Sequence, residues 1–164
     1  SPDEVARLAD HLVLFDRGSI RDSGPIGEML TRTDLPLSHG DEAAAVVDAE
    51  VAGHDEEFQL TQLDFSGGRF TVTRKLLETG HQARLRILAR DVSLTLEAQA
   101  GTSILNIFPA TVEQIAEENP SQVTVRLDIG GASILSRITR KSAALLELQP
   151  GKQVYAQVKS IALL

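Results

Sequence analysis

The chain has 164 residues, of which 42% are hydrophobic and 24% charged, so it is long enough for one ordinary globular domain or two small ones. It contains no cysteine, which excludes disulfides and thiolate metal sites, and its formal net charge of −7 argues against general nucleic-acid binding through clustered basic side chains. Five Phe and one Tyr are too few for base-stacking platforms.

Motifs for catalysis or metal binding are scarce. The pair Gly151-Lys152 lacks the preceding glycine and the following hydroxyl of a phosphate-binding GxxxxGK[ST] loop. The four histidines are scattered, without HxxxH or HExxH spacing, and are predicted to be surface or loop residues. The opening SPDEVARLAD is unlike a secretory signal, and no segment is apolar enough to span a membrane. The sequence therefore predicts a cytoplasmic chain that is not itself an enzyme and holds no cofactor or free metal ion.

Residues 1–37 predict a helix, two strands and a short second helix. Ser1 and Glu4 suit a capping box with Pro2 at the first helical position. The two strands flank a turn at positions 16–18. A helix and a lone hairpin cannot bury their apolar faces alone, so this segment is interpreted as the end of a larger domain. The small and polar residues 38–44 are typical of a linker.

From residue 45 onward, apolar and polar residues alternate as in half-buried strands. Two stretches share one order of elements, with LDF before Gly67-Gly68 in the first and LDI before Gly130-Gly131 in the second, each predicted to have a short helix nearby. Their ends, ARDVSL and VKSIAL, also align. The prediction is a mainly β fold with two tandem small barrels of the OB-like kind, residues 45–98 and 99–164. The alternative is two unrelated hairpins with common turns.

The second stretch contains candidate ligands for a small anion. Ser103 and Asn106 precede a strand, and Lys159 and Ser160 interrupt an apolar one near the end. One cation with several neutral donors suits an oxyanion, whereas a metal cation would need carboxylates or imidazoles. The alternative is structural: the Lys159 stem lies along the barrel wall with its head in water, and the polar residues are ordinary turn residues.

These features resemble the ATP-binding subunits of bacterial molybdate ABC importers. SPDEVARLADHLVLFDRGSIRDSGP is similar to the stretch after the switch histidine of such ATPases. ARDVSLTLEAQAGTSILNIFPATV and GKQVYAQVKSIAL resemble the regulatory Mop-type (TOBE) barrels of the same family. The resemblance covers nearly the whole chain and implies that residues 1–37 are the C-terminal end of an ABC ATPase domain.

By this resemblance, the ligand is molybdate or tungstate. Ser103 and Asn106 fall on the family's binding loop and Lys159 and Ser160 on its Lys-Ser pair, while two further positions that sometimes complete the site are Thr139 and Ser142. Leu105 stands where many relatives have arginine, which removes a charge-assisted donor. In the first repeat, Arg90-Asp91 replaces the Lys-Ser pair, so binding is expected in the second repeat.

The resemblance also implies partners and location. ATP and Mg²⁺ would bind only in the missing ATPase domain, the barrels would form a homodimer, and the full protein would join membrane permease subunits on the cytoplasmic face of the inner membrane. Two rival interpretations remain. One is an oligonucleotide-binding barrel, which the acidic charge disfavours. The other is a ligand-free accessory or dimerisation domain of a sulfate or sugar ABC importer, which Leu105 keeps open.

Overall fold

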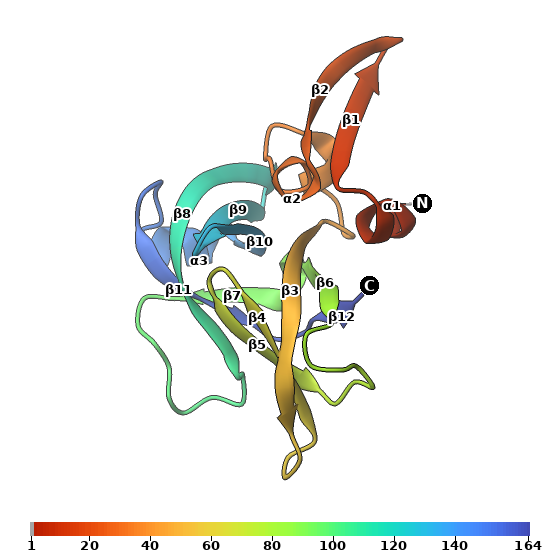
Figure 1. The fold of residues 1–164 in the computed structure, drawn as a ribbon. Helices are drawn as coiled ribbons and strands as arrows, with labels where there is room; N and C mark the ends of the chain where they lie inside the picture. The colour runs from red at the N-terminus through yellow and green to blue at the C-terminus, as the bar shows by residue number, and fades with distance from the viewer. Residues whose placement is uncertain (1) are drawn as a thin grey trace.

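The computed structural model describes residues 2–164, with side chains from Glu4 onward, so the capping role predicted for Ser1 lies outside the described residues. The N-terminal segment has the predicted order of helix, strand, strand and short helix (Figure 1). The predicted turn is confirmed, because Arg17 and Gly18 both have positive φ angles. The elements of this segment are α1 (Pro2–Leu8), β1 (His11–Asp16), β2 (Ser19–Pro25), α2 (Ile26–Met29) and η1 (Pro36–Ser38).

The rest of the chain forms two five-stranded antiparallel sheets, as the alternating sequence pattern predicts. The first has the order β12-β6-β3-β4-β5 and the second the order β10-β9-β8-β11-β7. The first-half elements are β3 (Ala44–Asp55), β4 (Leu60–Phe65), β5 (Gly68–Thr73), β6 (Gln82–Leu88), η2 (Ala89–Asp91) and β7 (Val92–Thr95). The second-half elements are β8 (Asn106–Asn119), β9 (Gln122–Ile129), β10 (Ala132–Thr139), α3 (Arg140–Leu145), β11 (Gln153–Val158) and β12 (Ala162–Leu163).

The two halves exchange their last strands. β7, from the first half, pairs with β11, and β12, from the second half, pairs with β6. The two connecting segments meet where they cross, since the Lys159 N–H donates to the Asp91 carbonyl at 2.9 Å. These segments are the aligned motifs ARDVSL and VKSIAL. One apolar core joins both sheets, and in it Phe108 of β8 packs against Phe65 and Phe70 with ring centroids 5.3 and 4.9 Å away.

The paired glycines of the two repeats lie in hairpins that touch each other. A Cβ atom on Gly67 would lie 2.0 Å from the Ile129 carbonyl oxygen, and one on Gly130 would lie 2.4 Å from the Gly67 Cα atom. Both contacts are with backbone, which has little room to move. The glycines thus permit a close approach between hairpins as well as the turns expected from the sequence. The short helix predicted after each hairpin forms only in the second half, as α3; residues 74–81 form an irregular loop instead, with a turn at positions 79 and 80.

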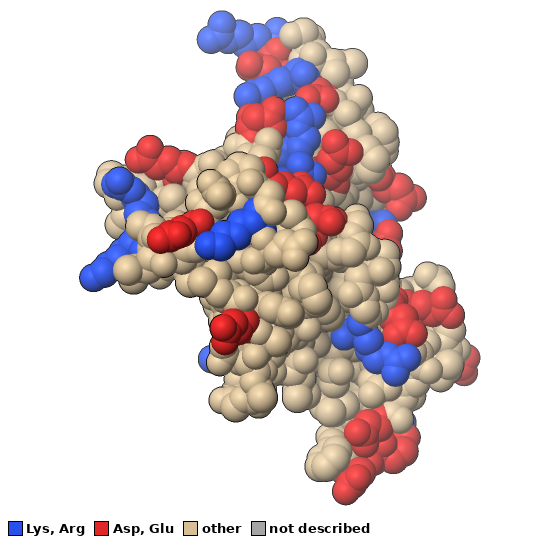
Figure 2. Space-filling view, turned by 90° about the vertical axis from the view of Figure 1, so that its left-hand side faces the viewer, with Lys and Arg blue, Asp and Glu red and all other residues tan. Residues whose placement is uncertain are grey.

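The N-terminal segment is docked at its base and exposed at its tip. Ile26 of α2 and Ala6 of α1 are buried against Val46 of β3. The Arg84 guanidinium also joins the segments, donating to the Ala6 carbonyl at 3.1 Å and to the Asp48 carboxylate at 2.7 Å. The β1–β2 hairpin projects away from the sheets (Figure 1), and charges of both signs are interspersed at this end of the molecule (Figure 2). No helix within residues 2–164 is long and apolar enough to cross a bilayer.

A partly buried carboxylate fastens the linker to the second sheet. Glu118 of β8 accepts hydrogen bonds from Gly40 N and Thr124 Oγ1, both at 2.9 Å, and its Oε2 lies 2.6 Å from His39 Nδ1. Burial would raise the pKa of Glu118, but the hydrogen bonds from Gly40, His39 and Thr124 and the charge of Arg137 lower it to about 2. The carboxylate is therefore ionised over the whole physiological range.

His39 has a hydrogen-bond acceptor at each ring nitrogen. Its Nε2 lies 2.7 Å from the Thr33 carbonyl oxygen, while Nδ1 faces Glu118. Neutral imidazole carries a single N–H, so only imidazolium donates to both acceptors. The Thr33 carbonyl raises the pKa of His39, burial opposes this, and Glu118 adds to the rise, whereas Arg137 lowers it. The linker is held best when His39 is protonated.

Gly67→Ala is expected to lower the free energy of unfolding by about 2–3 kcal/mol, because the added methyl group overlaps the Ile129 backbone. Urea denaturation followed by circular dichroism measures this change. Gly101→Ala is the matched control, since nothing lies within 4 Å of a Cβ atom at that position. Equal stability of the two variants would show that the hairpins do not meet as described.

His39→Gln is expected to lower the free energy of unfolding by about 1 kcal/mol in weak acid and by less in alkali. The pKa of His39 is raised on folding, so its stabilising contribution is complete below the ordinary value of 6.5 and is lost as pH rises through the folded value. The Glu118 contribution, with its lowered pKa, is complete above 4.5 and is lost as pH falls toward about 2.

Urea denaturation at about pH 5.5 and about pH 9 would compare this variant with wild type on both sides of the His39 transition. The exposed His11 offers the control, because His11→Gln removes an imidazole outside this cluster. A stability difference for His39→Gln that is the same at both pH values would contradict the imidazolium role.

Candidate functional site

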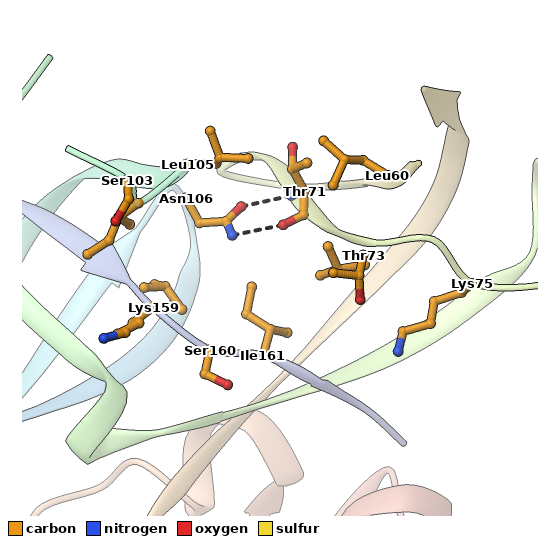
Figure 3. Close-up of a pocket in the computed structure, with 13 residues that line it drawn as sticks. Leu60, Thr71, Thr73, Lys75, Ser103, Leu105, Asn106, Lys159, Ser160 and Ile161 are labelled. Carbon is orange, nitrogen blue, oxygen red and sulfur yellow. Dashed lines mark hydrogen bonds between the residues drawn. The ribbon is translucent and has the colours of Figure 1, made fainter. Parts of the chain in front are cut away.

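A pocket of about 370 Å³ opens where the exchanged strands cross (Figure 3). Its walls come from three places: β5 with the residues just after it, the loop before β8, and the segment between β11 and β12. Both halves of the chain therefore contribute to it. The polar residues that line it are Thr71, Thr73, Lys75, Ser103, Asn106, Lys159 and Ser160. Among the described residues, no group of three or more His, Cys, Asp or Glu is arranged to hold a metal ion.

Four of the six anion-site residues predicted from the sequence line this pocket: Ser103, Asn106, Lys159 and Ser160. The other two do not. Thr139 caps the N-terminus of α3, where its Oγ1 accepts a hydrogen bond from the Ser142 N–H at 3.0 Å and lies 3.0 Å from Ser142 Oγ. Within one chain, Thr139 and Ser142 thus serve a helix cap rather than the pocket.

Asn106 bridges the two halves. Its Oδ1 accepts from the Thr71 N–H at 2.7 Å, and its Nδ2 donates to the Thr71 carbonyl at 2.9 Å, so the side-chain amide mimics a strand partner for β5. Asn106 is only 8% exposed. A carboxamide has two N–H groups, and the second remains available to a ligand. The main role of the Asn106 side chain is therefore to hold β5. Its remaining N–H can serve as a donor to a ligand.

Lys159 and Ser160 lie on the link that connects the sheets. The Lys159 backbone is fixed by its bond to the Asp91 carbonyl, while both side chains are exposed. In Figure 3 the Lys159 ammonium lies on the Ser103 side of the pocket and points away from Ile161. Among the side chains that the structure describes, from Glu4 onward, no carboxylate is paired with it. The ammonium is free to meet a mobile anion.

Lys75 and Thr71 belong to the pocket but were not identified from the sequence. The Lys75 N–H donates to Thr61 Oγ1 at 2.9 Å, and the same hydroxyl oxygen lies 2.9 Å from His54 Nδ1. His54 Nε2 lies 2.7 Å from the Leu77 carbonyl oxygen. Thr61 is fully buried, so this small network fixes the loop after β5 at the mouth of the pocket. No local motif marks Lys75; only the strand exchange brings it near Lys159.

The matching position in the first half is filled by apolar residues. Ala89 donates its N–H to the Ala43 carbonyl, as Val158 pairs with Asn106 in the second half. Leu135 of β10 occupies the hairpin position that Thr71 has in β5. The cluster formed by Ala43, Ala89 and Leu135 is at most 4% exposed. It has neither the amide tie nor the polar lining, which supports the expectation that the second repeat carries the site.

The chain is similar to proteins of known families. Residues 102–164 match the TOBE domain model. The chain is 49% identical to the molybdenum import ATP-binding protein ModC of Aromatoleum aromaticum, over 100% of this chain and 44% of the relative. It is 52% identical to ModC of Hahella chejuensis, over 100% of this chain and 46% of the relative. The chain thus spans less than half the length of these curated relatives.

A solved structure shares the fold. It is the cytoplasmic molybdate-binding protein ModG with molybdate bound, which superposes with a TM-score of 0.61 at 26% sequence identity. The match covers 72% of this chain and 93% of that one. Most of the two sheets described above therefore has a counterpart in a protein crystallised with an oxyanion.

Asn106→Ala is expected to lower the free energy of unfolding by about 1–3 kcal/mol, because it leaves the Thr71 N–H and carbonyl without partners in a poorly solvated position. Urea denaturation without ligand measures this. Ser103→Ala, which changes an exposed side chain of the same pocket, should stay within about 0.5 kcal/mol of wild type. If Asn106→Ala were as stable as Ser103→Ala, the amide would not tie the halves together.

Proposed function

The whole chain corresponds to the C-terminal part of the ModC molybdenum import ATP-binding proteins, and from this premise we propose that it is the regulatory, oxyanion-binding region of such a subunit. Molybdate or tungstate is the proposed ligand, held in the pocket at the strand crossing. The observation that carries the proposal is the pocket's donor set: an unpaired ammonium, hydroxyls and a carboxamide N–H, from Lys159, Ser103, Ser160 and Asn106. The ModG structure, with the same fold and molybdate bound, supports this ligand class.

The donor set fits a tetrahedral dianion. Molybdate at neutral pH has four acceptor oxygens and no proton to donate, so every pocket donor can find an acceptor. Phosphate near neutral pH retains a proton, and its O–H facing a donor would cost about 1–3 kcal/mol, enough for roughly tenfold or more of discrimination. Sulfate carries the same charge as molybdate without a proton. Only the fit of the larger ion into the pocket would separate these two.

The proposed role is feedback on transport. Bound oxyanion would favour the resting arrangement of the importer over the transporting one, which requires tighter binding to the resting state. ATP and Mg²⁺ would bind in the part of the subunit that this chain does not span, so the chain by itself would not hydrolyse ATP. The full subunit would contact membrane permease subunits at the cytoplasmic face of the inner membrane.

A homodimer through the barrels is part of this proposal. Thr139 and Ser142, which serve as a helix cap within one chain, would reach a ligand only in the pocket of a second copy. The rival interpretation, a ligand-free accessory domain of a sulfate or sugar importer, is not favoured, because the relatives with about half of their residues identical are molybdenum import proteins.

Calorimetry with molybdate, tungstate, sulfate and phosphate would test the proposal on wild type and Lys159→Ala. Wild type should bind the first two ions, and the variant should lose about 1.5–3 kcal/mol of binding free energy, as expected for a hydrogen bond to a charged group. Arg17→Gln, at an exposed cation between β1 and β2 and away from the pocket, should bind as wild type does. Failure of wild type to take up molybdate or tungstate at millimolar concentration would refute the proposed function.

A further inference from the structure

We propose that Lys75 is a second cation of this oxyanion site and supplies, from the first half of the chain, the positive charge that Leu105 cannot provide. The inference rests on the proposed function and extends it to a residue in the other repeat. Lys75 lines the same pocket as Lys159. Figure 3 shows the two lysines on opposite sides of the pocket, with Ser160 and Ile161 between them. The Lys75 side chain extends toward Ser160 and Ile161.

Two lysines at one pocket have no carboxylate partner among the described side chains. Most arginines at the surface of the sheets are paired with carboxylates, as Arg69 is with Asp64 and Arg74 with Glu56, both at 2.6 Å. The structure shows no such partner for the ammonium of Lys75 or Lys159 among residues 4–164, whose side chains it describes. In a chain of net charge −7, two unpaired cations at one pocket form a local positive field that attracts anions.

The position of Lys75 is fixed although its side chain is free. Its N–H is held by Thr61 Oγ1 at 2.9 Å, and Thr61 is in turn in contact with His54 Nδ1 at 2.9 Å. Both supporting residues belong to the first sheet, Thr61 in β4 and His54 in β3. A lysine whose backbone is held in this way loses less freedom when it binds, which favours its use as a ligand.

A dianionic ligand needs two positive charges for full neutralisation. One ammonium beside a dianion leaves a net negative charge in the pocket, and a second ammonium on the opposite wall neutralises it. Leu105 is 66% exposed at this pocket and carries no donor, so the loop before β8 does not supply that charge. Lys75 does so from the other wall. A ligand held between Lys75 and Lys159 would also connect the first sheet to the link between the sheets.

This arrangement predicts a preference for dianions over monoanions of the same shape. Calorimetry with molybdate and with perrhenate, a tetrahedral monoanion, would compare wild type with Lys75→Gln. The variant should bind molybdate about tenfold more weakly, the size of effect expected for one charge-assisted hydrogen bond, and its preference for molybdate over perrhenate should fall. The loss should shrink as salt is added, because these side chains are exposed.

Three further variants sharpen the test. Lys75→Arg keeps the charge and should retain most of the affinity, whereas Arg17→Gln, which removes an exposed cation between β1 and β2, should leave affinity and ion preference unchanged. Leu105→Arg combined with Lys75→Gln should recover affinity, because it places a new cation in the pocket, on the loop before β8. Thermal unfolding without ligand, unchanged in Lys75→Gln, would show that the fold is intact.

The two proposals fail in different ways. If wild type binds molybdate and Lys75→Gln binds it equally well with the same preference over perrhenate, the role of Lys75 is refuted and the proposed function stands. If Lys75→Gln and Arg17→Gln lose affinity to the same extent, the effect is one of overall charge and the inference is also refuted. If wild type binds neither ion, both proposals fall.

Discussion

The exchange of terminal strands between the two halves is the constraint on which the rest of the structure depends. β7 is the edge of the second sheet and β12 the edge of the first, so neither sheet is complete without the other half. The touching glycine hairpins and the Phe108 contacts hold the halves at the distance that this exchange requires. The two halves thus share one core. The predicted domain boundary between 45–98 and 99–164 stays a prediction, and strands of each half pair across it.

The same exchange creates a pocket on one side and fills its counterpart on the other. Where the links cross, Ala43 in the first half matches Asn106 in the second, and the pair Arg90-Asp91 matches Lys159-Ser160. The pair Asn106–Thr71 replaces what is a purely apolar contact in the other repeat. Differences at these few positions separate a polar pocket in one half from an apolar contact in the other.

Sequence patterns predicted the local features well and the long-range ones poorly. Period-two alternation and the LDF and LDI turns located the strands and hairpins, because these depend on neighbouring residues. The exchange of β7 and β12 was not predicted, since any exposed edge could accept a two- to four-residue strand. Lys75 was missed for the same reason. Asn106 was found as a donor, but its tie to Thr71 depends on a partner 35 positions away.

The late pairing of β12 also has a consequence for synthesis on the ribosome. The first sheet lacks its edge strand until residues 162–163 have emerged, although β3 to β6 are made much earlier. During that interval the open side of β6 exposes unpaired backbone groups and apolar side chains of the core, a surface prone to aggregation. Such non-local pairing also slows folding, because the chain loses loop-closure entropy before the contacts between distant segments stabilise it. Folding of the first sheet without aggregation therefore depends on the pairing of residues 162–163 with β6.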